Sequence, residues 1–175
     1  MSTASTTRSL HTGSNVLQLG APHSWHAAAM TAAGFDLERF LDAQAPVIAQ
    51  VQSELRAGAK RTHWMWFVFP QIAGLGHSAM AQRYAIASLN EAKAYADHPV
   101  LGARLRDCTA LVLGVEGKTV HAIFGTPDDL KFHSCMTLFA RAAPEEPLFR
   151  QALKQLFRGR QDPLTVARLQ DQTGD

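Results

Sequence analysis

The stretch KRTHWMWFVFP, residues 60–70, decides the fold class of this chain. Its apolar half, from Trp64 to Pro70, has a length that fits either a buried strand or a short buried helical turn. No partner strand is evident elsewhere in the sequence. A strand without a partner would leave its backbone N–H and C=O groups unpaired. We therefore expect short helix or irregular structure that packs into the core.

Outward from this stretch, the sequence predicts helices on both sides. Apolar residues recur at helical spacing after Pro46, and Gly58 ends that run. Asp36 and Ser78 are good N-cap residues. The predicted helices span 37–42, 46–57, 79–88, 90–97, 100–113, 119–124 and 148–158, and two more begin at Thr126 and Asp162. We expect one all-α domain over residues 35–170, an irregular multihelical array rather than an up-and-down bundle, because the helices are short and punctuated by glycine and proline.

The start at Thr126-Pro127-Asp128-Asp129 carries the clearest helix signal: a threonine cap, proline at the first position and acids in the first turn. Helical spacing then predicts two faces. The apolar face holds Phe132, Met136 and Phe139, and the polar face holds Ser134, Thr137 and Arg141.

Composition narrows the class of protein. The chain has 175 residues, 46% hydrophobic and 18% charged, with a net charge of +2, which is ordinary for one globular domain. Bulk charge gives no argument for nucleic acid or membrane as a partner, and no apolar run approaches the roughly 20 residues that span a bilayer. We expect Cys108 and Cys135 to be buried free thiols in a protein of a reducing compartment. The scattered histidines give no metal motif. We expect a cytoplasmic protein with no metal and no cofactor.

Residues 1–34 differ from the rest, since Arg8 is their only charged residue. Three interpretations stay open: a disordered tail outside the fold, which we favour, an organelle transit peptide, or translation that begins at Met30. Residues 171–175 are expected to be a disordered C-terminus.

Four strings carry a resemblance to a known family: HWMWFVFPQ at 63–71, GLGHSAMAQRYAI at 74–86, EAKAYADHPVLGARL at 91–105 and FGTPDDLKFHSCMTLF at 124–139. They resemble the bacterial family catalogued as domain of unknown function 1810, over about residues 35–169. The resemblance implies a compact multihelical domain and no particular activity.

Members of that family sometimes carry the label calpastatin. The eukaryotic inhibitor of that name is a disordered chain of low hydrophobicity, whereas this sequence has three tryptophans and nine phenylalanines. The label therefore carries little weight. Cys135 departs from the family pattern, which leads one to expect a second serine beside Ser134. If that hydroxyl had a chemical role, this chain would be impaired in it.

Eight residues within or beside these strings are candidates for a ligand site: Lys60, His63, Trp66, Gln71, His77, Ser78, Lys131 and Ser134. The aromatics of residues 64–69 would stack a flat ligand, with Lys60 and His63 as a cationic rim. The loop Gly74-Leu75-Gly76-His77-Ser78 would offer free amides to an anion. The plainer interpretation makes the aromatics core anchors, the charges surface and Ser78 an ordinary cap.

Three classes of function compete. The first is binding of a small flat or anionic ligand, nucleotide-derived compounds included, in a pocket made by residues 60–71, the glycine loop and the Thr126 helix. The second is a protein interaction module, using an apolar patch or the basic stripe of Arg150, Lys154 and Arg158. The third is an enzyme that uses Lys131 and Ser134, or His63, although the Ser–Lys order is reversed and no oxyanion hole is evident. His121 and His133 are further candidates for general bases, but no carboxylate is placed beside either by spacing.

Overall fold

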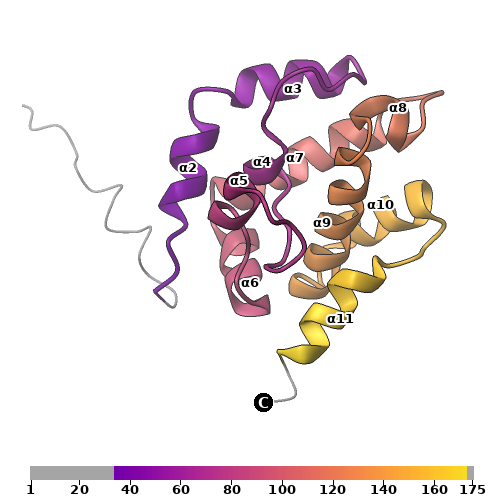
Figure 1. The fold of residues 1–175 in the computed structure, drawn as a ribbon. Helices are drawn as coiled ribbons and strands as arrows, with labels where there is room; N and C mark the ends of the chain where they lie inside the picture. The colour runs from indigo at the N-terminus through magenta and orange to yellow at the C-terminus, as the bar shows by residue number, and fades with distance from the viewer. Residues whose placement is uncertain (1–33, 173–175) are drawn as a thin grey trace, which may run out of the picture.

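The computed structural model describes residues 34–172, and the predictions made for residues 1–33 and 173–175 lie outside the described residues. Ten helices and no strand occur within 34–172. The helices are α2 (Glu38–Gln44), α3 (Ile48–Arg56), α4 (Met65–Val68), α5 (Ala79–Arg83), α6 (Leu89–Asp97), α7 (Leu101–Leu113), α8 (Val120–Phe124), α9 (Asp128–Ala142), α10 (Pro147–Phe157) and α11 (Pro163–Asp171). The prediction of an irregular all-α domain is confirmed (Figure 1).

Helix α9 lies at the centre of the array (Figure 1). It packs against α6, α8, α10 and α11. Because neighbours surround it, the polar face predicted for α9 is not a solvent face: Ser134 and Thr137 are both buried. Their hydroxyls donate hydrogen bonds to carbonyls of the same helix: Ser134 to Leu130 (3.1 Å) and Thr137 to His133 (3.0 Å). This face lies instead at the junction with the start of α11, where Ser134 and Thr137 both bond to Asp162.

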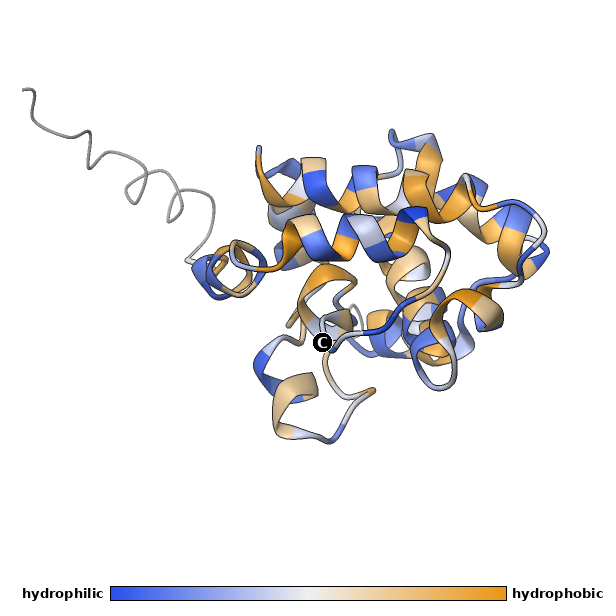
Figure 2. Ribbon diagram, turned by 90° about the horizontal axis from the view of Figure 1, so that it is seen from above, coloured by the Kyte–Doolittle hydropathy of each residue, from blue (hydrophilic) through white to orange (hydrophobic). Residues whose placement is uncertain are grey.

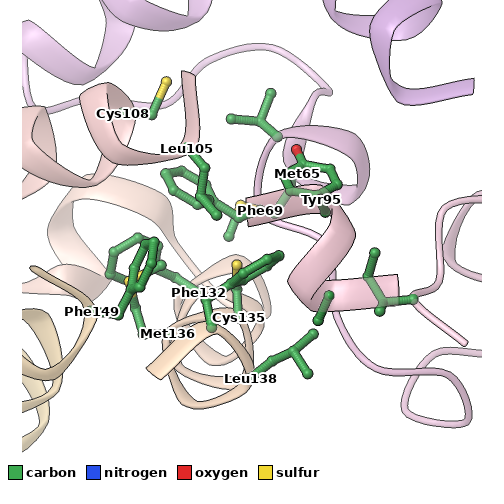
Figure 3. Packing of buried hydrophobic residues seen from close by; sticks show 14 of the residues in the cluster. Met65, Phe69, Tyr95, Leu105, Cys108, Phe132, Cys135, Met136, Leu138 and Phe149 are labelled. Carbon is green, nitrogen blue, oxygen red and sulfur yellow. The ribbon is translucent and has the colours of Figure 1, made fainter. Parts of the chain in front are cut away.

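One continuous hydrophobic core joins the helices. Figure 3 shows part of it, where Met65 of α4, Tyr95 of α6, Leu105 of α7, Phe132 of α9 and Phe149 of α10 come together. Each large apolar side chain buried in such a core stabilises the fold by about 1.5–3 kcal/mol. Seen from above, most helices carry hydrophobic and hydrophilic residues in turn along their length, as partly exposed helices do (Figure 2).

The stretch at 64–70 forms the short helix α4, one of the two structures expected from its sequence. Trp64, Phe67 and Phe69 are buried, and Trp66 is half-buried. Cys108 and Cys135 are buried free thiols. No helix within 34–172 has the length and apolar character needed to cross a membrane.

Two helix starts differ from expectation. Helix α9 begins at Asp128 with Pro127 as its N-cap residue, one position later than predicted. The Thr126 hydroxyl does not cap a backbone amide; it lies 3.3 Å from both Asp129 carboxylate oxygens. Helix α2 begins at Glu38, and the Asp36 carboxylate accepts a long bond of 3.4 Å from the Arg39 amide. By contrast, Asp162 caps α11 as expected, accepting from the Thr165 amide at 2.9 Å.

The helix predicted over 79–88 is wrong in extent, since α5 ends at Arg83. Tyr84 and Ile86 both turn into the core. Alternate residues face one way only in extended backbone, so the chain leaves the helix here. The Ile86 amide donates instead to the Gln71 carbonyl at 2.8 Å, which forms a single β-bridge between Ile72 and Ile86.

Candidate functional site

A surface cavity of about 180 Å³ lies beside the aromatic stretch. Trp66 and Gln71 form one side of it. The rest is formed by residues of the segment between Ile72 and Ala85, including Gly74 and Gly76 but not His77 or Ser78 of the glycine loop. Among the described residues that line it, none is acidic. A closed apolar cavity of about 150 Å³ accepts benzene, so this one has room for a molecule with a single ring.

Trp66 connects the cavity to a cation. The Lys131 ammonium lies 4.8 Å from the centre of the Trp66 ring, within the range of a cation–π interaction. The same ammonium donates a hydrogen bond to Asp128 Oδ1 at 2.8 Å. Lys131 and Asp128 are three residues apart on α9, so they are neighbours on one helix face.

Lys60 completes this group from the other side. Its ammonium lies 2.7 Å from Asp128 Oδ2, and only 8% of the Lys60 side chain is exposed. It also lies 5.2 Å from the Trp64 ring centre. Burial acts to raise the pKa of Asp128, but its bonds to Lys131 and Lys60 outweigh burial and lower that pKa. Asp128 is therefore ionised at neutral pH, and two lysines on one carboxylate leave one positive charge in excess.

Glu54 of α3 fixes the chain that leads to Trp64. It is buried, and its carboxylate accepts from the Arg61 amide (2.8 Å), the Thr62 amide (3.2 Å) and the Trp64 indole N–H (2.8 Å). Burial acts to raise the pKa of Glu54, but these bonds, with others from the side chains of Thr62 and Gln50, lower it to about 2. Glu54 has no distinguishing signal in the sequence, because nothing in its helical spacing separates it from a solvent-facing glutamate.

The eight candidate residues fall into three groups. Trp66 and Gln71 line the cavity, and Lys131 contacts Trp66. Lys60 reaches the same cluster through Asp128. His63, His77 and Ser78 are exposed. The hydroxyl of Ser78 accepts a hydrogen bond from the Ala81 amide at 3.1 Å and so caps α5, as the plainer interpretation expected.

Ser134 lies apart from this cluster in its contacts. Its hydroxyl is 3.0 Å from Asp162 Oδ2, the same oxygen that accepts from the Thr165 hydroxyl at 2.6 Å. These bonds join α9 to the start of α11. With Lys131 engaged by Asp128 and Ser134 by Asp162, the two side chains have different partners and no hydrogen bond links them within the described chain.

The two further histidines have neighbours that spacing did not reveal. His121 Nδ1 lies 2.9 Å from Asp129 Oδ2, so a carboxylate does stand beside this ring, contrary to expectation. His133 stacks on Phe157 with ring centres 4.0 Å apart, and its Nε2 lies 2.8 Å from the Arg160 carbonyl. Within residues 34–172, no group of three or more His, Cys, Asp or Glu side chains is arranged to hold a metal ion.

Several residues in or beside the cavity had no sequence signal. Tyr84 and Gln82 line it, although both were expected inside a regular helix. Arg168 of α11 donates to the Gly74 carbonyl at 3.3 Å across ninety-four positions of sequence. This contact depends on how α11 docks against the loop, and no pattern in the sequence around Arg168 or Gly74 indicates it.

Comparison with known proteins adds the family. The family described as "Protein of unknown function (DUF1810)" matches residues 34–169 of the chain. The crystal structure of the conserved hypothetical protein Rv1873 from Mycobacterium tuberculosis is similar to it, with 55% sequence identity and a TM-score of 0.77. The match covers 79% of this chain and 99% of that one. Among curated proteins, none matches the sequence significantly.

Proposed function

Since this chain belongs to the family described as protein of unknown function DUF1810, we propose from its own geometry that it binds a small, flat, anionic ligand in the cavity beside Trp66. The observation that carries the proposal is that Trp66 lines the cavity and also receives the Lys131 ammonium. An aromatic surface and a cation at one place favour a ligand that has both a ring and a negative charge.

The charge arrangement supports an anion rather than a cation. Asp128 is neutralised by Lys60, whose side chain is nearly buried, so an incoming anion can draw on Lys131 without leaving the carboxylate unpaired. The lining contributes no acid to repel such a ligand. Charge-assisted hydrogen bonds from an ammonium to a phosphate or carboxylate are about twice as strong as neutral ones.

Gln71 adds a side-chain amide that would hydrogen-bond to the edge of a bound ring. The Gln71 side chain is half-buried and lines the cavity, and its side-chain amide forms no hydrogen bond within the described residues. An amide offers both a donor and an acceptor, which suits a heteroaromatic ring or a ring amide. Nucleotide-derived compounds and aromatic carboxylates both have this chemistry.

A thermal-shift screen of the full chain tests the proposal, using nucleoside monophosphates, phosphorylated metabolites and aromatic carboxylates. A ligand at 100 times its dissociation constant adds about 2.7 kcal/mol to the free energy of unfolding. We expect Lys131→Met and Gln71→Leu to remove the shift. Lys154→Met, at an exposed lysine of α10, is the matched control and should retain it. No shift with any compound, or equal shifts in all variants, would contradict the proposal.

A protein interaction module remains the second candidate, and one observation favours it. Leu130 and Leu164, in the first turns of α9 and α11, are 60% and 64% exposed. Exposed apolar side chains mark a contact surface where they form one contiguous patch, and we infer that these two contribute to such a patch. If the screen finds no ligand, sedimentation of the full chain tests this candidate. Concentration-dependent association that Leu130→Gln with Leu164→Gln removes would favour it.

A further inference from the structure

The chain between Ile72 and Ile86 leaves the body of the fold and returns to the same place. Ala73 N–H donates to the Ile86 carbonyl and Ile86 N–H donates to the Gln71 carbonyl, both at 2.8 Å. Ile72 and Ile86 are themselves fully buried. Residues 73–85 thus form a surface loop with a tight, buried neck, the geometry of an Ω-loop, and loops of this kind are often functional.

Most of this loop has little attachment to the core. Helix α5, its only regular element, buries none of its residues, and Met80 exposes its apolar side chain to solvent. The hydrogen bonds of α5 are local: Gln82 N–H donates to the Ser78 carbonyl and Tyr84 N–H donates to the Met80 carbonyl. A segment with few buried apolar contacts opens at a lower free energy than the core does.

The cavity lies between this loop and the body of the protein. Trp66, Gln71 and Ile72 form the side that belongs to the body, and residues 73–85 supply the remaining lining. Movement of the loop away from Trp66 therefore widens the entrance to the cavity, and its return encloses whatever is bound there.

Contacts from distant helices hold the two ends of the loop. At the first end, Arg168 of α11 donates to the Gly74 carbonyl. At the second end, Arg39 of α2 donates to the carbonyls of Arg83 (3.1 Å) and Ala85 (3.0 Å), and is itself held by Glu91 at 2.6 Å. The second end is therefore fixed by a partly buried ion pair, whereas the first is held by one exposed bond of 3.3 Å.

We propose that residues 74–83 are a lid over the cavity, whose weakly held end at Gly74 is latched by Arg168. Gly74 has a φ of +90°, a conformation that side chains disfavour, and an added Cβ would lie 3.0 Å from the Arg168 guanidinium. Gly76 allows the closed form, because an added Cβ there would lie 2.5 Å from Ala81 Cβ. The lid would control access to the ligand site proposed above. Only the identity of the molecule that it admits rests on the proposed function.

Amide hydrogen exchange by NMR on the ligand-free full chain tests the lid. The Gln82 amide lies in it, the Tyr84 amide donates to the Met80 carbonyl within it, and the amides of Ala73 and Ile86 lie in the neck. All four are hydrogen-bonded, so each exchanges only when its bond opens. We expect Gln82 and Tyr84 to exchange at least about tenfold faster than Ala73 and Ile86. Equal rates in lid and neck would overturn the proposal.

Variants then separate a latched lid from a loop that is simply loose. Arg168→Met removes the latch, and Gly76→Ala forces the segment around Gly76 away from α5 within the lid. Both variants should speed exchange at Gln82 and Tyr84 while leaving the neck unchanged. Arg160→Met replaces another exposed arginine, whose side chain makes no hydrogen bond or ion pair within residues 34–172, and should change nothing. No acceleration in Arg168→Met would exclude the latch.

A fluorine signal connects the lid to the cavity. Fluorine NMR of the chain labelled with 5-fluorotryptophan reports on both residues. Gly76→Ala should shift the resonance of Trp66, which lines the cavity. It should leave the resonance of Trp64, which is buried against Glu54, unchanged. An unchanged Trp66 resonance would contradict a lid that covers it. Because these measurements need no ligand, the lid can fail while ligand binding stands, and the converse also holds.

Discussion

The ammonium of Lys131 and the indole ring of Trp66 lie 4.8 Å apart, between a central helix and the half-buried member of the aromatic stretch. Trp64, two positions earlier, is also beside a lysine, Lys60 at 5.2 Å, but is fully buried. The two tryptophans thus have similar surroundings and different access to solvent. That difference assigns Trp64 to the fold and Trp66 to the cavity.

Trp64→Phe and Trp66→Phe should differ in their cost. Trp64→Phe removes the indole donor from the buried Glu54 carboxylate, and a buried acceptor that loses its partner costs about 1–3 kcal/mol. Trp66→Phe removes no side-chain hydrogen bond within residues 34–172 and should cost under about 1 kcal/mol. Urea denaturation of both variants measures the contrast. Equal destabilisation would contradict the assignment of different roles.

Stability should fall in acid because of Glu54. Its pKa in the folded protein is about 2, below the value of 4.5 for a free glutamate. The unfolded chain therefore binds the proton more readily, and the stabilisation is present above pH 4.5 and is lost as the pH falls toward 2. The change amounts to about 3 kcal/mol. Glu54→Gln should be less stable at pH 7 and should have a flatter dependence on pH in this window. A wild-type slope retained in Glu54→Gln would exclude this residue as its source.

Asp128→Asn should destabilise the protein more than Lys131→Met does. Loss of the carboxylate leaves the nearly buried Lys60 without its ion pair, whereas loss of Lys131 leaves Asp128 still bound to Lys60. Removing one partner of a buried pair costs up to about 3–5 kcal/mol, and partial exposure reduces that figure here. Thermal unfolding at neutral pH gives the order of the two variants. The reverse order would show that Lys60 does not depend on Asp128.

Ser134→Ala should cost about 1 kcal/mol of stability, the contribution of one buried hydrogen bond. Its hydroxyl joins α9 to Asp162, the cap of α11. Asp162→Ala should cost more, about 1–2 kcal/mol, because the cap of α11 is lost as well. Chemical denaturation measures both. If Ser134→Ala retains full stability while abolishing a ligand-dependent shift, the hydroxyl belongs to the site and not to the helix junction.

Gly102→Ala should destabilise the fold although alanine favours a helix over glycine by about 1 kcal/mol. A Cβ at this position of α7 would collide with the Ala96 carbonyl oxygen at the end of α6. Overpacking against backbone costs about 1–3 kcal/mol, which exceeds the gain in propensity. Gly114→Ala is the control, since an added Cβ there meets only ordinary contacts of 3.5 Å or more. Stability equal to that of the control would contradict the close approach of α6 and α7.

The sequence determined those features that depend on neighbours along the chain. Helical spacing, proline and glycine located most of the helices, and the absence of a partner strand excluded a strand at residues 64–70 in favour of short helix or irregular structure. Asp162 followed by proline placed the start of α11 correctly. These signals lie within short stretches of sequence, because a helix satisfies most of its backbone hydrogen bonds within its own segment. The early end of α5 was missed, since the Ile72–Ile86 bridge that replaces the helix joins two segments of chain.

Tertiary structure alone decided which residues meet. Trp66 and Lys131 both stood among the candidates, but only packing of α9 beside α4 brings them together. It also separates Ser134 from that pair by engaging it with Asp162, and it brings Arg168 to Gly74. Glu54 became an anchor because the following loop folds back onto it. The physical reason is that contacts between distant segments depend on how helices dock, which the core as a whole determines and no short pattern encodes.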